Sequence, residues 1–73
     1  MTPPHEFIAE ELSARGWTHL DIAERSGCSV VLAKALCTGK RRITRVGAVL
    51  LANAFGTSSD LWLGLQKQWD EQA

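Results

Sequence analysis

The segment from Thr18 to Gly39, THLDIAERSGCSVVLAKALCTG, constrains the fold of this chain more than any other part of the sequence. It predicts two short helices joined at a glycine. Thr18 is a good N-cap for the first helix, and Asp21 makes a capping-box-like pair with it. We expect this helix to end near Arg25, because Gly27 can adopt the left-handed conformation that terminates a helix without a Cβ clash.

The second helix of the pair is expected to begin after Ser29, which can cap it, and to end at Gly39. Ala33, Leu36 and Cys37 are expected on its inward side. This order of elements is the helix-turn-helix layout, whose second helix enters the major groove of DNA. The alternative is an ordinary antiparallel helix pair in a small bundle, because short helix–glycine–helix segments are common.

Charge is strongly segregated along the chain. Between Arg25 and Ser59 the sequence has six basic residues and no acidic residue, although the formal net charge of the whole chain is +0. The basic run KRRITR, residues 40–45, directly follows the second helix of the pair, where contacts to DNA phosphates are expected. A solvated loop with chance clustering is the alternative, and the one-sided bias over half the chain disfavours it.

Composition is typical of one small globular domain, residues 1–73, near the lower size limit for a self-sufficient core. No apolar run reaches membrane-spanning length and no signal peptide is apparent, so we expect a cytoplasmic protein without a membrane partner. Cys28 and Cys37 lack metal-ligand spacing and are expected to be reduced core residues. His5 and His19 are isolated, and nothing in the sequence predicts a catalytic residue, a metal site or a cofactor.

Three further helices are predicted, over residues 4–14, 44–55 and 58–69, so the expected fold is an all-α bundle of five helices. Gly16 and Gly56 are placed to end two of them, and Thr44 is placed to cap one. Trp17, between the first two helices, is expected to wedge against the core. No alternating run or hairpin signal predicts a strand.

The last predicted helix carries a broad apolar stripe, which comprises Leu61, Trp62, Leu65 and Trp69. In a chain this short, part of the stripe could remain uncovered and form a homodimer interface. The alternative, that both tryptophans pack inward, carries about equal weight.

Several stretches of the sequence together resemble the HigA-type antitoxins, within the wider lambda-repressor-like (XRE) helix-turn-helix family. They cover nearly the whole chain and are PHEFI (4–8), EEL (10–12), GWT (16–18), residues 20–27, GKRRIT (39–44), LANAFGTS (51–58) and WLGLQ (62–66). The resemblance implies a five-helix DNA-binding domain that represses its own operon as a dimer. It also implies a partner, a HigB-type toxin that cleaves mRNA.

Ten residues from the helix pair and the basic run are expected to contact double-stranded operator DNA: Thr18, His19, Ser29, Val30, Val31, Lys34, Thr38, Lys40, Arg41 and Arg42. The sequence departs from the family at His19, where glutamine is common, and on the outer face of the second helix, which reads Val30, Val31, Lys34 and Ala35. Apolar side chains can still read thymine methyl groups.

Two alternative functions remain open. One is a stand-alone phage- or plasmid-type repressor without a toxin. The other is a protein-interaction module that keeps the fold and binds a partner protein through Val30, Val31 and Leu50. Salt dependence separates the second from DNA binding, because DNA affinity falls steeply with salt and an apolar protein interface does not.

Overall fold

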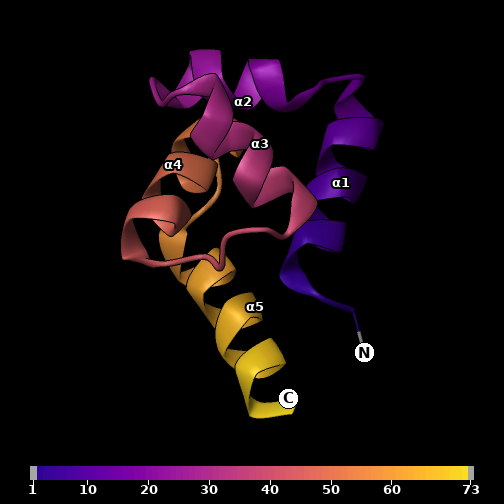
Figure 1. Cartoon of the computed structure of the whole chain (residues 1–73), viewed down its shortest axis with the longest axis vertical. Coiled ribbons are helices and arrows are strands. Elements are labelled where there is room, and N and C mark those ends of the chain that lie inside the picture. The colour runs from indigo at the N-terminus through magenta and orange to yellow at the C-terminus, as the bar shows by residue number, and fades with distance from the viewer. Residues whose placement is uncertain (1, 73) are drawn as a thin grey trace.

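The computed structural model describes residues 2–72, and within them the chain forms five α-helices and no strand (Figure 1). The predicted all-α class is therefore confirmed. The last helix continues three residues beyond its predicted end. The helices are α1 (Pro4–Arg15), α2 (His19–Ser26), α3 (Val30–Thr38), α4 (Arg45–Phe55) and α5 (Ser59–Gln72).

Glycine in the left-handed conformation separates α2 from α3, as the sequence predicts. Gly27 has φ 76° and donates its N–H to the carbonyl oxygen of Ala23 at 2.9 Å. Gly39 ends α3 with φ 79°, and a Cβ there would lie 2.5 Å from Nδ1 of His5. Gly39 is thus required both for its backbone conformation and for the close approach of α1 to the end of α3.

Side-chain caps begin three of the helices. The Thr18–Asp21 capping box is present at α2, and the hydroxyl of Ser29 accepts the N–H of Leu32 at 3.1 Å at the start of α3. Ser58 accepts the N–H of Leu61 in the same way before α5. Thr44 occupies the N-cap position of α4, but its side chain makes no capping hydrogen bond. Thr44 therefore stands at the predicted N-cap position, but the side-chain hydrogen bond expected of an N-cap is absent.

Every helix contributes one large side chain to the centre of the core. The five largest fully buried side chains are Ile8, Ile22, Leu36, Leu51 and Trp62, one from each helix in chain order. Helix formation and tertiary packing are therefore coupled, because the unfolding or detachment of any one helix would expose one of these side chains to water.

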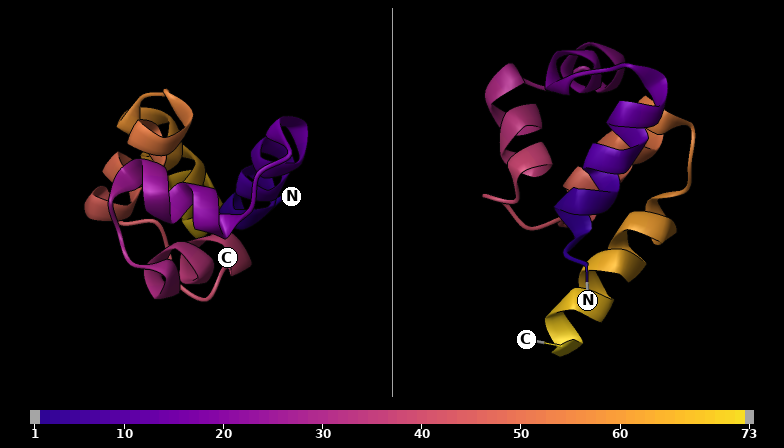
Figure 2. Two further views of the ribbon diagram at one scale, coloured as in Figure 1. Left: turned by 90° about the horizontal axis from the view of Figure 1, so that it is seen from above. Right: turned by 90° about the vertical axis from the view of Figure 1, so that its right-hand side faces the viewer.

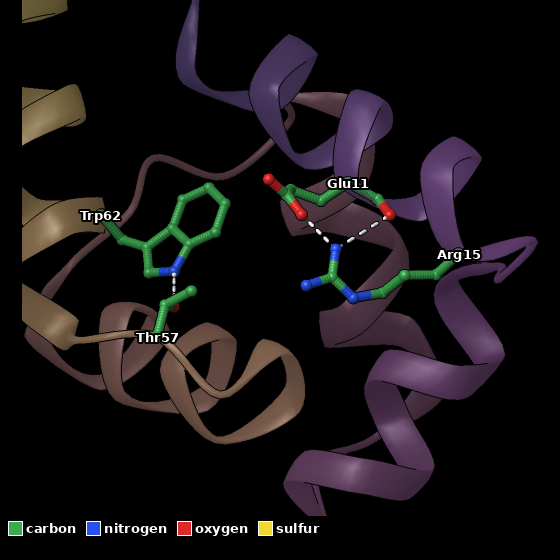
Figure 3. Close-up of polar contacts among 4 residues, drawn as sticks. All are labelled: Glu11, Arg15, Thr57 and Trp62. Carbon is green, nitrogen blue, oxygen red and sulfur yellow. Dashed lines mark hydrogen bonds and ion pairs between the residues drawn. The ribbon is translucent and has the colours of Figure 1, made fainter.

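Trp62 belongs to the core and does not lie on the surface. Its side chain is 1% exposed, and its indole Nε1 donates a 2.8 Å hydrogen bond to the hydroxyl oxygen of Thr57 (Figure 3). The indole therefore has both the apolar surroundings and the hydrogen-bond partner that a buried tryptophan needs.

Trp17 packs against the core between α1 and α2, as predicted. Its ring stacks on Phe55 with centroids 5.9 Å apart and an angle of 8° between the planes. The guanidinium carbon of Arg25 lies 3.9 Å from the Trp17 ring centroid. Arg15 pairs with Glu11 on α1 (Figure 3). Its guanidinium carbon lies 5.0 Å from the ring centroid of Phe55. The guanidinium of Arg25 therefore covers the indole of Trp17, and that of Arg15 covers the ring of Phe55.

The second half of α5 projects beyond the other helices, and both ends of the described chain lie at that end of the molecule (Figure 2). The segment between α3 and α4, residues 39–44, passes beside α5 (Figure 1). Within residues 2–72, no helix has the length and apolar character needed to cross a bilayer.

Candidate nucleic-acid interface

The outer face of α3 is exposed and apolar at its beginning. Val31 is 80% exposed, the highest value among the large hydrophobic residues that the structure leaves in solvent. Val30 is also exposed, as is Lys34 one turn further along. The sequence predicts this face correctly, because helical periodicity turns it away from the side that carries the buried Ala33 and Leu36.

A shallow groove of about 250 Å³ lies along this outer face. Its lining consists of Val31, Lys34, Ala35, Thr38 and Lys40. Four of these residues are among those expected to contact DNA. The two lysines stand beside an apolar floor, which is the combination that suits a base edge with a methyl group flanked by phosphates.

Thr18 and Ser29 use their hydroxyl oxygens as acceptors for the helix caps. Thr18 accepts the N–H of Leu20 at 3.2 Å, and Ser29 accepts the N–H of Leu32. Each hydroxyl still has its O–H available as a donor, so capping does not prevent a contact to a phosphate oxygen. His19 follows Thr18 at the start of α2 and is half-buried. The groove on α3 does not include Thr18, His19 or Ser29 in its lining.

The structure divides the basic segment between two surfaces. Lys40 lies at the groove on α3 together with Lys34. Arg41 and Arg42 instead line a cavity of about 290 Å³ between α1, the 39–44 segment and α5, and a smaller one beside α4. The ten expected contact residues therefore do not form one continuous lining.

Arg42 is held by α5. Its guanidinium pairs with the carboxylate of Asp70, whose other oxygen accepts a 2.9 Å hydrogen bond from Nε2 of Gln66. Oε1 of Gln66 in turn accepts the backbone N–H of Ile43 at 2.8 Å. Sequence reasoning missed Gln66 and Asp70. The one available signal was Gln66 itself, a polar residue one turn after Trp62 on the inward side of α5.

The apolar stripe predicted on α5 is split by the fold. Trp62 is buried within the chain and cannot contact a second copy in this conformation. Leu61 is exposed, whereas Leu65 and Trp69 are half-buried. The surface left for a partner on α5 is therefore narrower than the sequence suggests.

Both cysteines are free thiols, half-buried and packed against the core. Burial raises the pKa of the Cys37 thiol from 9.0 to about 11, and the neighbouring Cys28 adds to the increase. Cys37 is therefore a protonated and weakly nucleophilic thiol at neutral pH. In the part of the chain that the structure describes, no group of three or more His, Cys, Asp or Glu residues is arranged to hold a metal ion.

No protein-family model matches the chain, and no curated protein matches it either.

Proposed function

We propose that this protein is a sequence-specific DNA-binding regulator of transcription, with α2 and α3 acting as a lambda-repressor-like helix-turn-helix. The main support for this proposal is the groove on the outer face of α3, in which the apolar Val31 and Ala35 lie beside two lysines, Lys34 and Lys40. The short connection through Gly27 supports it, since α3 is set against α2 with its outer face free.

In this proposal Val31 and Ala35 approach base edges, while Lys34 and Lys40 approach the phosphates on either side. Arg41 and the hydroxyl donors of Thr18 and Ser29 provide further contacts to the backbone. Specificity would come chiefly from methyl contacts, because this face offers few groups that can make paired hydrogen bonds to a base.

The regulator is proposed to act as a homodimer in the cytoplasm, and as the antitoxin of a HigB-type toxin. Dimerisation is supported by the exposed Leu61 and the half-buried Leu65 and Trp69 on α5. Two copies would place two recognition helices about 34 Å apart, one turn of DNA. The proposal of a toxin partner rests on the sequence resemblance alone. A toxin-like reading frame beside the gene would favour the antitoxin over a stand-alone repressor.

A second candidate is a protein-interaction module. The exposed valines on two helices favour it: Val31 on α3, and Val46 and Val49 on α4, with Val46 67% exposed. Such a surface would bind a partner protein with little dependence on salt, unlike a DNA interface.

The test is duplex binding at several salt concentrations, measured by fluorescence anisotropy with the wild type, Arg41→Gln and Lys67→Gln. Each variant loses one positive charge from an exposed position, but only Arg41 belongs to the basic segment. We expect a steep salt dependence for the wild type. For Arg41→Gln the slope should be less negative by about 0.9. Lys67→Gln should match the wild type.

An absence of duplex binding at low salt would contradict DNA binding and favour the interaction module. Equal slopes for all three proteins would remove Arg41 from the interface.

A further inference from the structure

We propose that the cavity between α1, the 39–44 segment and α5 is a binding site for a small aromatic carboxylate. The cavity encloses about 290 Å³ and is separate from the groove on α3. Its walls come from both ends of the chain and from its middle, so it exists only in the folded protein. The α1 wall is formed by Pro3, Pro4 and His5.

The size of the cavity selects a ligand with a single ring. A volume of about 290 Å³ corresponds to about ten water molecules in the liquid. It lies at the lower end of the range for small-molecule pockets, about 300 Å³. A benzoate-sized molecule fits this space, whereas a nucleotide does not.

The walls of the cavity select an aromatic ring. The buried side chains of Leu36 and Ile43 form one apolar wall of the cavity, and the half-buried indole of Trp69 forms a second. The rings of Pro3 and Pro4 contribute further apolar surface. A planar ring would stack on the indole and replace water on these surfaces.

The polar groups of the cavity select an anion. Gln66 also lines it, but both ends of its amide are already hydrogen-bonded, to Ile43 and to Asp70. Arg42 is paired with Asp70, so its charge is largely compensated. The ion pairs among residues 2–72 do not include Arg41, whose guanidinium therefore retains its donors for a carboxylate.

Two further groups add to this preference. His5 also lines the cavity and carries a ring nitrogen that can donate a hydrogen bond, and the positive end of the α1 dipole lies at the same place. A bound carboxylate would therefore join Arg41 to α1. If the basic segment contacts DNA as proposed, occupancy would withdraw one phosphate contact and weaken duplex binding.

Titration of the folded protein with benzoate, followed by NMR and without DNA, tests this site. The indole N–H signals of the three tryptophans report on it independently. Trp69 lines the cavity, whereas Trp17 and Trp62 do not. We expect benzoate to shift the Trp69 signal with a dissociation constant on the order of 1 mM, as suits a ligand of about nine non-hydrogen atoms. The Trp17 and Trp62 signals should stay in place.

Benzamide, the neutral analogue with the same ring, should shift the Trp69 signal much less. Arg41→Gln should weaken benzoate binding by about fivefold or more, while Arg45→Gln, an exposed arginine outside the cavity, should bind as the wild type does. Unchanged Trp17 and Trp62 signals would show that each variant is folded.

Three results would overturn the site. The first is that the Trp69 signal does not shift up to about 20 mM benzoate, twenty times the expected dissociation constant. The others are that benzamide shifts this signal as much as benzoate does, or that Arg41→Gln binds benzoate as tightly as the wild type. Because the titration contains no DNA, its failure is distinct from a failure of the proposed DNA binding.

Discussion

The backbone N–H of Ile43 donates a 2.8 Å hydrogen bond to Oε1 of Gln66, which lies 23 residues further along the chain. Both residues are buried. The same glutamine donates to Asp70, which pairs with Arg42. Helix α5 thus holds the segment that carries the basic residues, and the position of that segment depends on a helix that carries none of the expected DNA contacts.

Replacing Gln66 by methionine should destabilise the protein by about 1–3 kcal/mol, because the buried N–H of Ile43 loses its acceptor while the side-chain volume is nearly kept. Urea unfolding followed by tryptophan fluorescence measures the free energy of unfolding. Gln68→Met on the exposed side of α5 is the control and should change it by less than about 0.5 kcal/mol. Equal effects of the two substitutions would show that the hydrogen bond contributes no stability.

Asp70→Asn should release Arg42 to bind phosphate. Since the pair is exposed, the change in stability should be small, within about 1 kcal/mol. Duplex affinity at low salt should rise, and the salt slope should steepen by about 0.9. Glu71→Gln changes the net charge equally at the neighbouring exposed position and serves as the control. A matching increase in Glu71→Gln would mean that net charge, rather than the freed arginine, is responsible.

The groove on α3 should read a thymine methyl group through Val31. In a site selected from random duplexes, replacing the thymine that faces α3 by uracil should cost about 0.8 kcal/mol, or about fourfold in affinity. The same replacement should cost clearly less in Val31→Ala, because the methyl group then loses most of its apolar contact at this position. A uracil effect of equal size in both proteins would contradict this contact.

Trp69→Ala should shift a monomer–dimer equilibrium toward the monomer, because Trp69 is the largest residue of the α5 stripe that is not fully buried. Sedimentation velocity at micromolar concentration is the measurement, and Gln68→Ala on the same helix is the control. A wild type that sediments as a monomer, or a Trp69→Ala variant that remains a dimer, would assign Trp69 to another role.

The free energy of unfolding should fall as the pH rises from 9 toward 11. The folded state holds the Cys37 thiol proton up to about pH 11, whereas a thiol with the ordinary pKa of 9.0 releases it earlier. Above pH 9 the unfolded state therefore binds fewer protons than the folded state, and deprotonation favours unfolding. Urea unfolding at several pH values should show a smaller decline for Cys37→Ala than for the wild type. Parallel declines would indicate that other groups cause the loss.

Helix boundaries could be predicted well because the signals that set them are local. The capping box of Thr18 and Asp21, the cap at Ser29 and the turn at Gly27 each involve residues within one helical turn. The outer face of α3 follows from the helical periodicity of its inward residues, which is also a local signal. The end of α5 was misjudged, because that helix continues to Gln72 without a glycine or proline to stop it.

The division between core and surface needed the tertiary structure. The sequence left open whether the tryptophans of the α5 stripe pack inward or face a second copy of the chain, because both belong to one stripe. Packing of α4 against α5 buries Trp62 beside Phe55, with ring centroids 5.6 Å apart, and leaves Trp69 half-buried at the projecting end of α5.

The sequence by itself determined the five helices and the exposed apolar face of α3, because helix signals and periodicity act over a few residues. Only the tertiary structure separated Lys40 from Arg41 and Arg42, and only it joined Ile43 to Gln66. These relationships depend on where α5 crosses the 39–44 segment. That crossing is set by the fit of large side chains from all five helices into one core, and no local pattern of residues encodes it.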